Sequence, residues 1–525
     1  MVNADYLKNL NKAQTQAVTY LEGPLLIVAG AGSGKTKVLT SRIAHIIKEK
    51  KAYPNQILSV TFTNKAAKEM QSRISSILGA GATGLSWFGT FHSICAKLLR
   101  KHASAVNLNS NFTIIDTDDQ TRLIKNICKA ENIDVKQLAP RYILAIIDRW
   151  KNKGLYPSEV IIDQKDIYEK TILPVYKIYQ RKLTDLNACD FGDLILHVVK
   201  IFEKNIDIRE IYSKNFKYIL VDEYQDTNYI QSRWLNLLAE KNKNLCCVGD
   251  DDQSIYSWRG AEIKNFLEFD QIYEDTKVIR LEQNYRSTQN ILSVASQLIS
   301  YNQNRVGKTL KATMEDGDLI NLNCYKNGRD EAIGVSDEME KIKKKYPYNN
   351  VAILVRAIFQ TREFEERFLK IGLPYRILGG TKFYERAEIK DCVAYLRSVH
   401  QHKDDLAFER IVNNPKRSIG DSTLKQIHEF ARINSSSLEF ASRKMIEQNL
   451  IKPKTKLGLS IFLNSISKWR SDLENKKINH IKLLQIILDE SGYSAMVKNK
   501  KDIENENRLE NIKELLSAMK EFDNL

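Results

Sequence analysis

Residues 24–36 decide the fold of this chain, and they read Pro-Leu-Leu-Ile-Val-Ala-Gly-Ala-Gly-Ser-Gly-Lys-Thr. The apolar residues 24–28 predict a short buried strand, and residues 29–35 predict a turn built from small residues. The apolar pattern after Thr36 predicts an amphipathic helix. A strand, a glycine-rich turn and a helix in this order form a phosphate-binding loop, because small residues let backbone N–H groups approach phosphate oxygens.

The last two residues of this loop have predicted roles. Lys35 is placed for the β- and γ-phosphates of a nucleotide, and the Thr36 hydroxyl is placed for Mg²⁺. The loop departs from the usual pattern at Ala29, where a glycine is expected, and a glycine-rich surface turn is the alternative. The loop residues predicted to bind nucleotide are Ala29, Gly30, Ala31, Gly32, Ser33, Gly34, Lys35 and Thr36.

Residues 220–228, Leu-Val-Asp-Glu-Tyr-Gln-Asp-Thr-Asn, contain the second half of a hydrolytic site. The apolar run 218–221 predicts a strand that ends directly on Asp222 and Glu223. One such carboxylate can hold Mg²⁺ through water, while the other orients and deprotonates the attacking water. Two acidic residues after a strand also suit a solvated loop, but together with the phosphate-binding loop they predict nucleotide hydrolysis.

The composition of the chain gives weaker guidance. Its 525 residues suffice for several domains, and its net charge of +15 favours a polyanionic partner. An AT-rich genome, which encodes Lys and Asn often, explains the same charge. The seven cysteines form no Cys-x-x-Cys pair, which predicts reduced thiols in a cytoplasmic protein and no metal cluster. Neither a signal sequence nor a membrane-spanning run is apparent, so no membrane association is expected.

Further strands are predicted at 57–62, 245–248 and 278–281, with helical patterns between them. Strands that alternate with helices indicate an α/β fold with a parallel sheet. The chain from Lys35 to Asp222 is too long for strand–helix units alone, and its central part has helical periodicity. We therefore expect a helical insert in this interval.

A second α/β segment follows residue 281, with strands predicted at 319–325 and 351–355, and beyond it the pattern is nearly all helical. Two strands are too few to complete a sheet. A helical stripe that includes Leu509 runs almost to Leu525 without a closing element, so we expect the chain to be the front part of a longer protein. The expected domains are 1–105 with 187–280, a helical insert at 106–186, the first part of a second α/β domain at 281–379, and its helical insert at 380–525.

Residues 248–261, Val-Gly-Asp-Asp-Asp-Gln-Ser-Ile-Tyr-Ser-Trp-Arg-Gly-Ala, mix acidic, aromatic and basic side chains where a strand ends. Gln253 is a candidate for contact with a γ-phosphate. The rings of Tyr256 and Trp258 beside Arg259 are typical of stacking platforms for single-stranded nucleic acid, with a buried Tyr and Trp on a loop as the alternative. Similar mixtures follow other strands at the edge where open α/β sheets bind ligands, and they contain Phe62, Thr63, Asn64, Thr90 and His92, although His92 alone is more typical of a structural residue. Phe191, where the helical insert returns, is a candidate for a further stacking ring.

Two further residues have chemistry suited to a nucleotide. Arg286, in the run Leu-Glu-Gln-Asn-Tyr-Arg-Ser at 281–287, is a candidate arginine finger that would stabilise charge on the γ-phosphate, with a surface salt bridge as the alternative. Gln14 precedes the phosphate-binding loop, and its amide offers both a donor and an acceptor to the edge of adenine.

These segments, in this order and spacing, resemble a superfamily 1 helicase of the UvrD/Rep/PcrA group, and the runs 222–228 and 249–261 are highly specific to that group. The resemblance implies that Gln14 reads adenine and that Tyr285 stacks on it. It further implies Lys35, Glu223, Gln253 and Arg286 as catalytic residues, Thr36 and Asp222 as metal ligands, Arg42 as a further nucleotide-binding residue, and Phe62, Thr63, Asn64, Thr90, His92, Phe191, Tyr256, Trp258, Arg259 and Arg356 as DNA-binding residues.

The resemblance implies an α/β fold with two RecA-like P-loop NTPase domains, the second incomplete, each interrupted by a mainly helical insert. It implies an ATP-dependent 3′–5′ DNA helicase or single-stranded DNA translocase with ATP and Mg²⁺, acting in repair or replication. Expected partners are single-stranded and duplex DNA and repair or replication proteins, for a monomer or weak dimer in the bacterial cytosol at the nucleoid. The alternatives are a helicase subunit of a recombination nuclease complex and an inactive DNA-binding fragment, since the family's second arginine finger is not found.

Overall fold

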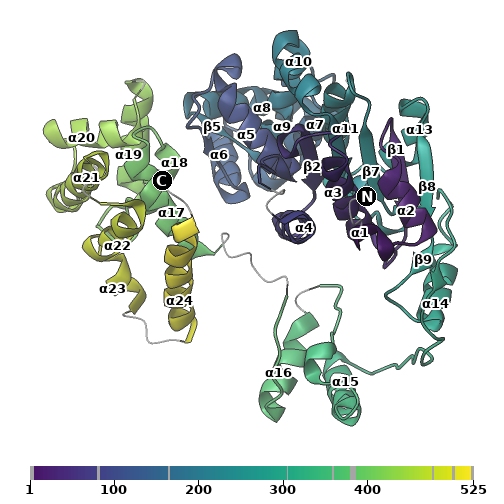
Figure 1. The fold of residues 1–525 in the computed structure, drawn as a ribbon. Helices are drawn as coiled ribbons and strands as arrows, with labels where there is room; N and C mark the ends of the chain where they lie inside the picture. Colours follow the sequence, from purple (N-terminus) through teal and green to yellow (C-terminus); the bar gives the residue numbers. More distant parts are fainter. Residues whose placement is uncertain are drawn as a thin grey trace. The chain divides into compact units, whose positions relative to one another are not determined.

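A six-stranded parallel sheet forms the centre of the N-terminal unit, residues 1–321, in the computed structural model (Figure 1). The structure describes residues 5–79, 83–162, 166–303, 305–357, 360–378, 386–434, 436–475, 478–498 and 503–521. The strand order is β3-β2-β6-β7-β1-β8, and each neighbouring pair is parallel. These strands are β1 Leu25–Ala29, β2 Ile57–Thr61, β3 Phe88–Thr90, β6 Tyr218–Val221, β7 Leu245–Gly249 and β8 Lys277–Leu281.

The central strands are apolar at nearly every position because helices cover both faces of the sheet. Successive residues point to opposite faces, so Ile27 and Val28 of β1 enter two different cores. The five strands predicted in this unit are confirmed to within one residue at each end. The first face packs on α2 Lys12–Thr19, α3 Lys35–Lys48 and α4 Asn64–Leu78, and the second on α5 Phe91–Lys101, α9 Phe191–Lys204 and α11 Tyr229–Ala239.

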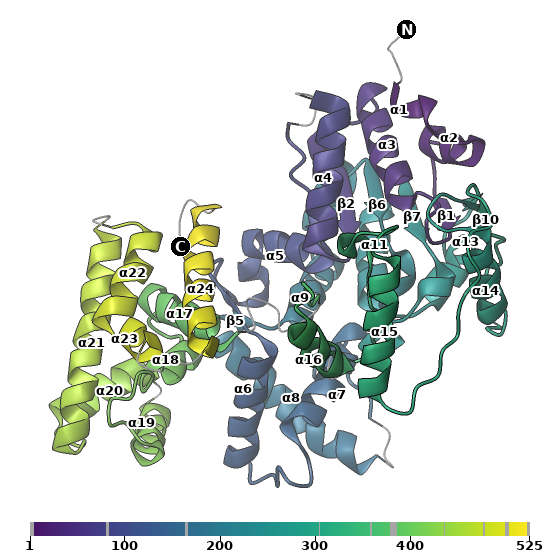
Figure 2. The same ribbon diagram turned by 90° about the horizontal axis from the view of Figure 1, so that it is seen from below.

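Between α5 and α9 the chain is mainly helical, as predicted, and α6, α7 and α8 pack against one another (Figure 2). A short parallel ladder of β4 Thr113–Ile114 with β5 Ala188–Cys189 closes this excursion. The domain boundaries drawn around it stay a prediction. The helices are α6 Thr117–Ala130, α7 Pro140–Asn152 and α8 Ile167–Asp185, and the unit also contains α1 Asp5–Lys8, α10 Ile206–Asn215, α12 Lys264–Leu267 and α13 Phe269–Ile272.

After β8 the chain returns to the phosphate-binding loop, which it contacts through residues 284 and 285. Two short parallel strands, β9 Gln283–Asn284 and β10 Lys311–Ala312, pair with each other, and α14 Gln289–Ile299 lies between them in sequence. This return places residues 283–286 and 305–313 close to the sheet edge that carries the predicted site.

In the described part of the second unit, residues 322–525, the regular elements are helices. A small core joins α15 Gly328–Ile342 to α16 Thr361–Ile371. A larger core surrounds Tyr395 and Trp469 and gathers the remaining helices into one body (Figure 2). These are α17 Ala387–His400, α18 Asp405–Ile411, α19 Asp421–Ile433, α20 Leu438–Glu447, α21 Pro453–Glu474, α22 His480–Glu490, α23 Tyr493–Lys498 and α24 Ile503–Ala518.

The strands predicted at 319–325 and 351–355 are wrong, because neither stretch forms a strand in the structure. Their apolar side chains are exposed, with Leu322 at 91% and Leu354 at 95% of full accessibility. A strand needs a neighbour for its backbone hydrogen bonds, and none pairs with these stretches within the described ranges. The predicted start of the last insert near 380 and the predicted end at Leu525 lie outside those ranges. No helix in the described ranges is both long and apolar enough to cross a bilayer.

Candidate nucleotide and nucleic-acid site

The phosphate-binding loop joins β1 to α3 and is held by its own hydrogen bonds. Ser33 is buried, and its hydroxyl donates to the Gly30 carbonyl oxygen at 2.7 Å. Gly32 and Gly34 have φ values of +70° and +88°, the left-handed region that favours glycine. A Cβ on Gly34 would lie only 2.8 Å from Gln14 Nε2. The loop therefore keeps bare backbone at the N-terminus of α3, an arrangement that favours binding of a phosphate group.

Asp222 and Glu223 follow β6, and Glu223 reaches the loop. Lys35 Nζ forms an ion pair with Glu223 Oε2 at 3.1 Å. The Glu223 backbone is in the left-handed region, with φ at +52°, a conformation that is uncommon outside glycine and is often found at functional sites. Asp222 is buried, and its Oδ1 accepts from the Glu223 backbone N–H. The structure thus gathers the predicted lysine and both predicted carboxylates.

The oxygen donors at this place fit Mg²⁺. Burial, and then the charge of Glu223, raises the pKa of Asp222 to about 6. A buried carboxylate of this kind is stabilised in its ionised form by a neighbouring cation. Mg²⁺ is typically bound in nucleotide sites by one or two carboxylates together with the substrate phosphates. Asp222, with the Thr36 hydroxyl on the first turn of α3, provides such a set.

Gln14 and Arg42 both have structural contacts. Gln14 is almost fully buried, and its Nε2 donates to the Ser33 carbonyl oxygen at 2.9 Å. Its Oε1 accepts from the Asn11 backbone N–H, so the amide supports the loop. The Arg42 guanidinium lies inside the protein and donates to the carbonyl oxygens of Ala17 and Tyr20, which ties α3 to α2. Contact of either residue with nucleotide stays a prediction.

Residues 284–286 lie directly on the phosphate-binding loop. The Tyr285 backbone N–H donates to the Gly32 carbonyl oxygen at 2.9 Å, and Asn284 Nδ2 donates to the Ala31 carbonyl oxygen. The Tyr285 ring and the Arg286 guanidinium lie at the surface, since both residues are exposed. The sequence did not indicate the role of Asn284, which is fully buried, because a single Asn gives no signal of a contact so distant along the chain.

The loop after β7 is linked to the carboxylates by Gln225. Gln225 Nε2 donates to Glu223 Oε2 at 2.9 Å, and Gln225 Oε1 accepts from the Asp250 backbone N–H at 3.0 Å. Asp250 in turn accepts a hydrogen bond from Gln253 Nε2. A continuous polar path therefore runs from Lys35 to Gln253. Gln225 stands inside a conspicuous run of the sequence, but its bridging contacts become visible only in three dimensions.

The predicted stacking residues form one aromatic surface at this edge. Tyr256 stacks on Phe62 with ring centroids 5.7 Å apart and planes 17° apart. The Arg259 guanidinium lies 4.6 Å from the Trp258 ring centroid and 5.1 Å from that of Tyr256. Trp258 is 73% exposed, which excludes the alternative of a core tryptophan. Exposed rings backed by arginine suit stacking on nucleic-acid bases.

The other predicted DNA-binding residues fall into three groups. Thr63 and Thr90 cap α4 and α5 through their hydroxyl oxygens, and Asn64 is exposed beside the first cap. His92 and Phe191 meet edge to face at 5.8 Å, and burial lowers the pKa of His92 to about 4, so its ring is neutral at pH 7. Arg356 is exposed and belongs to the second unit.

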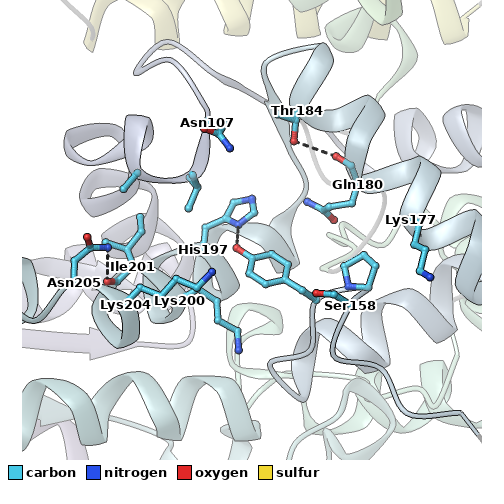
Figure 3. Close-up of a pocket in the computed structure, with 14 residues that line it drawn as sticks. Asn107, Ser158, Lys177, Gln180, Thr184, His197, Lys200, Ile201, Lys204 and Asn205 are labelled. Carbon is cyan, nitrogen blue, oxygen red and sulfur yellow. Dashed lines mark hydrogen bonds between the residues drawn. The ribbon is translucent and has the colours of Figure 1, made fainter.

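A buried ion-pair network fixes the helix that carries Phe191. Lys151 Nζ lies between Asp190 Oδ2 at 2.6 Å and Asp193 Oδ1 at 2.7 Å, and all three side chains are at most 1% exposed. Asp190 is also the N-cap of α9, which starts at Phe191. Beside this network is a cavity of about 710 Å³, lined by His197 and Lys200 of α9 and by Gln180 of α8, among other residues (Figure 3). None of its lining residues belongs to the predicted site.

Trp258→Ala is expected to weaken binding of single-stranded DNA by roughly 1–3 kcal/mol, the range for one base–aromatic stack. The loss should be similar for all base sequences, since every base has a π-face, and the melting temperature should hardly change. Titration of labelled oligonucleotides by fluorescence anisotropy measures it. Tyr53→Ala is a matched control, because Tyr53 is 74% exposed but precedes β2 at the opposite edge of the sheet. Unchanged DNA affinity with a lower melting temperature would contradict the assignment.

The fold and this site define a P-loop motor protein with a nucleic-acid surface. The sequence model of the UvrD/REP helicase N-terminal domain matches residues 10–274, and that of the UvrD-like helicase C-terminal domain matches residues 279–525. The chain therefore belongs to the UvrD/REP family of ATP-dependent DNA helicases. It is 45% identical to a probable DNA helicase II homolog of Rickettsia conorii, over 100% of this chain and 80% of that protein. It is 43% identical to the ATP-dependent DNA helicase PcrA of Bacillus subtilis, over 99% of this chain and 70% of that protein. It is also 43% identical to PcrA of Staphylococcus epidermidis, over 98% of this chain and 70% of that protein.

These matches bear on the expected second domain. The C-terminal family model covers residues 279–525, so the expectation of an incomplete second domain is not confirmed. The alternative of an inactive fragment without that domain loses its support for the same reason. The two helicase domains and the parallel sheet agree with the predicted RecA-like fold class.

Proposed function

We propose that this chain couples ATP hydrolysis to 3′-to-5′ movement along single-stranded DNA and to separation of duplex strands. The polar path from Lys35 through Glu223 and Gln225 to the Asp250 loop carries the proposal, because it joins the nucleotide loop to the segment that bears the exposed aromatic rings. A motor needs such a link, since each nucleotide state must alter the grip on DNA.

In the hydrolytic step the ion pair between Lys35 and Glu223 opens. Lys35 turns to the β- and γ-phosphates, and Glu223 is then available to accept a proton from the attacking water. Mg²⁺ bound by Asp222 and Thr36 would neutralise phosphate charge. Gln253 contacts the γ-phosphate and Arg286 acts as an arginine finger in this scheme. The remaining nucleotide contacts are proposed for residues 29–34, Gln14, Arg42 and Tyr285.

The DNA strand is proposed to run over the aromatic surface at the carboxyl edge of the sheet. Tyr256 and Trp258 would hold bases in alternate steps, with Arg259 behind them. Phe62, Thr63, Asn64, Thr90, His92, Phe191 and Arg356 are proposed as the other contacts. We place the protein with DNA in the bacterial cytosol, as a monomer or weak dimer that works with repair or replication proteins.

The decisive experiment measures ATP hydrolysis and strand separation together. We expect single-stranded DNA to stimulate ATP hydrolysis and a duplex with a 3′ single-stranded tail to be unwound. A duplex with a 5′ tail should stay intact, and Lys35→Ala should reduce both activities to background. ATP hydrolysis at the same rate with and without single-stranded DNA would contradict the proposed coupling. Unwinding of the duplex with a 5′ tail would reverse the proposed polarity.

A further inference from the structure

A largely buried cluster of five charged residues lies where the Asp250 loop meets the segment 305–313. Lys308 Nζ contacts Asp250 Oδ1 at 2.8 Å, Asp251 Oδ1 at 2.6 Å and Asp252 Oδ2 at 2.7 Å. Its side chain is only 1% exposed. Arg305 holds both carboxylate oxygens of Asp252, at 2.6 and 2.8 Å. The bidentate contact of Arg305 with Asp252 is partly buried, and the contacts of Lys308 with Asp250 and Asp251 are almost fully buried. Contacts of these kinds fix geometry better than fully exposed ion pairs do.

The cation at the centre of this cluster is a lysine. Three carboxylates this close together are a common ligand set for a divalent metal ion. Here the ammonium group of Lys308 contacts all three, and Arg305 neutralises the outermost. Burial alone would lower the pKa of Lys308, but its hydrogen bonds to the three aspartates outweigh burial and raise it. The cluster is therefore a fixed structural clamp: segment 305–313 supplies its two positive charges, and the Asp250 loop supplies its three negative charges.

The acidic half of the clamp controls the position of the DNA-contacting loop. The Gln253 backbone N–H donates to the Asp250 carbonyl oxygen at 2.9 Å, and Gln253 Nε2 donates to the Asp250 carboxylate. The chain then continues through two short turns to Tyr256 and Trp258. A shift of the three aspartates would therefore move Gln253 and the base of the aromatic surface.

The basic half of the clamp is anchored on the phosphate-binding loop. A Cβ on Gly30 would lie 2.4 Å from Leu310 Cδ2, so the Leu310 side chain packs directly on that glycine. The Thr313 backbone N–H donates to the Asn284 carbonyl oxygen, and Asn284 holds the Ala31 carbonyl oxygen. Segment 305–313 thus touches the nucleotide loop at one end and the Asp250 loop at the other.

We propose that Lys308 and Arg305 are positioning residues that transmit the state of the nucleotide site to the DNA-contacting loop. They form a second connection beside the path through Gln225, and the two connections meet at Asp250. A change at Gly30 or Ala31 on nucleotide binding shifts segment 305–313, and the clamp passes that shift to Asp250, Asp251 and Asp252. The proposal rests on the ATP and DNA binding proposed above and adds residues outside the predicted site.

The test is the change in single-stranded DNA affinity that a non-hydrolysable ATP analogue produces. The factor by which nucleotide changes DNA affinity is the coupling between the sites, and a purely structural residue leaves it unchanged. Arg305→Gln is the main variant, because Arg305 is 20% exposed and its loss leaves Lys308 in place. Arg280→Gln is the matched control, since Arg280 donates to the Gly307 carbonyl oxygen on the same segment but touches none of the three aspartates.

We expect Arg305→Gln to reduce the coupling factor by about fivefold or more while the affinity for the nucleotide analogue itself stays within about twofold of wild type. Arg280→Gln should keep the wild-type factor. Lys308→Met should abolish the coupling, and Lys308→Arg should restore part of it. A wild-type coupling factor in Arg305→Gln would overturn the proposal, whatever its melting temperature. A wild-type chain without nucleotide-dependent DNA affinity would instead refute the proposed function itself.

Discussion

Glu223→Gln is expected to keep nucleotide binding and to lose ATP hydrolysis by about 10²–10⁴-fold, the range for removal of a general base. The amide has nearly the shape of the carboxylate, but it cannot accept a proton from water. The Glu223 carboxylate is 36% exposed and lies at the end of β6, so the substitution should leave the core intact. Single-turnover hydrolysis and binding of a fluorescent nucleotide measure the two effects separately.

The contacts of Glu223 make the experiment more informative. Glu223 holds Lys35 before nucleotide binds, so loss of its charge should release the lysine and leave nucleotide affinity unchanged or increased. Glu240→Gln is a suitable control, because Glu240 pairs with Arg209 at the far end of α11. If Glu223→Gln loses nucleotide binding together with hydrolysis, Glu223 is a metal ligand or a structural residue, and the roles of Asp222 and Glu223 must be exchanged or abandoned.

The hydrolytic half of the site could be predicted from sequence because its signals are local. The strand, the glycines and Lys35 are neighbours in the chain, and the strand that ends on Asp222 and Glu223 is a single apolar run. Parallel strands then bring their carboxyl ends to one edge, so two local patterns suffice to place Lys35 beside Glu223. The exposure of Trp258 follows the same rule, since its loop leaves that edge.

The clamp could not be predicted because it depends on contacts between distant segments. Lys308 and Arg305 stand in a polar stretch without a pattern. Only the fold shows that Lys308 is buried, and Arg305 partly buried, against the Asp250 loop. Gln14 illustrates the same limit, since a free amide and one bonded to Ser33 look alike in sequence. The strands expected at 319–325 and 351–355 fail for a related reason: a suitable apolar pattern forms a strand only beside a partner.

The position of Phe191 depends on charges that no motif contains. Lys151, on α7, comes from the stretch expected to be an insert, whereas Asp190 and Asp193 begin α9 at the return to the sheet. Tyr179 also donates to Asp190, and Gln180 donates to Asp193. Lys151, from the helical stretch between α5 and α9, thus neutralises the carboxylates at the start of α9, the helix that carries the predicted DNA contact Phe191.

Lys151→Met is therefore expected to lower the free energy of unfolding by about 3–5 kcal/mol, the range for removal of one partner of a buried ion pair. Asp190 and Asp193 would remain buried without a cation, which is the main part of the loss. Urea denaturation followed by circular dichroism measures it. Lys200→Met is the control, because its pair with Glu159 is partly exposed and should contribute less than about 1 kcal/mol.

The triple variant Lys151→Met, Asp190→Asn, Asp193→Asn separates the charge effect from simple loss of packing. Asn caps helices as well as Asp does, so α9 can still begin at Phe191. With no ion left unpaired, part of the lost stability should return, since the uncompensated buried charges are the main cost of the single substitution. If the triple variant is as unstable as Lys151→Met alone, the lysine acts through its packing against Tyr176 and Tyr179, and the electrostatic account of this network is wrong.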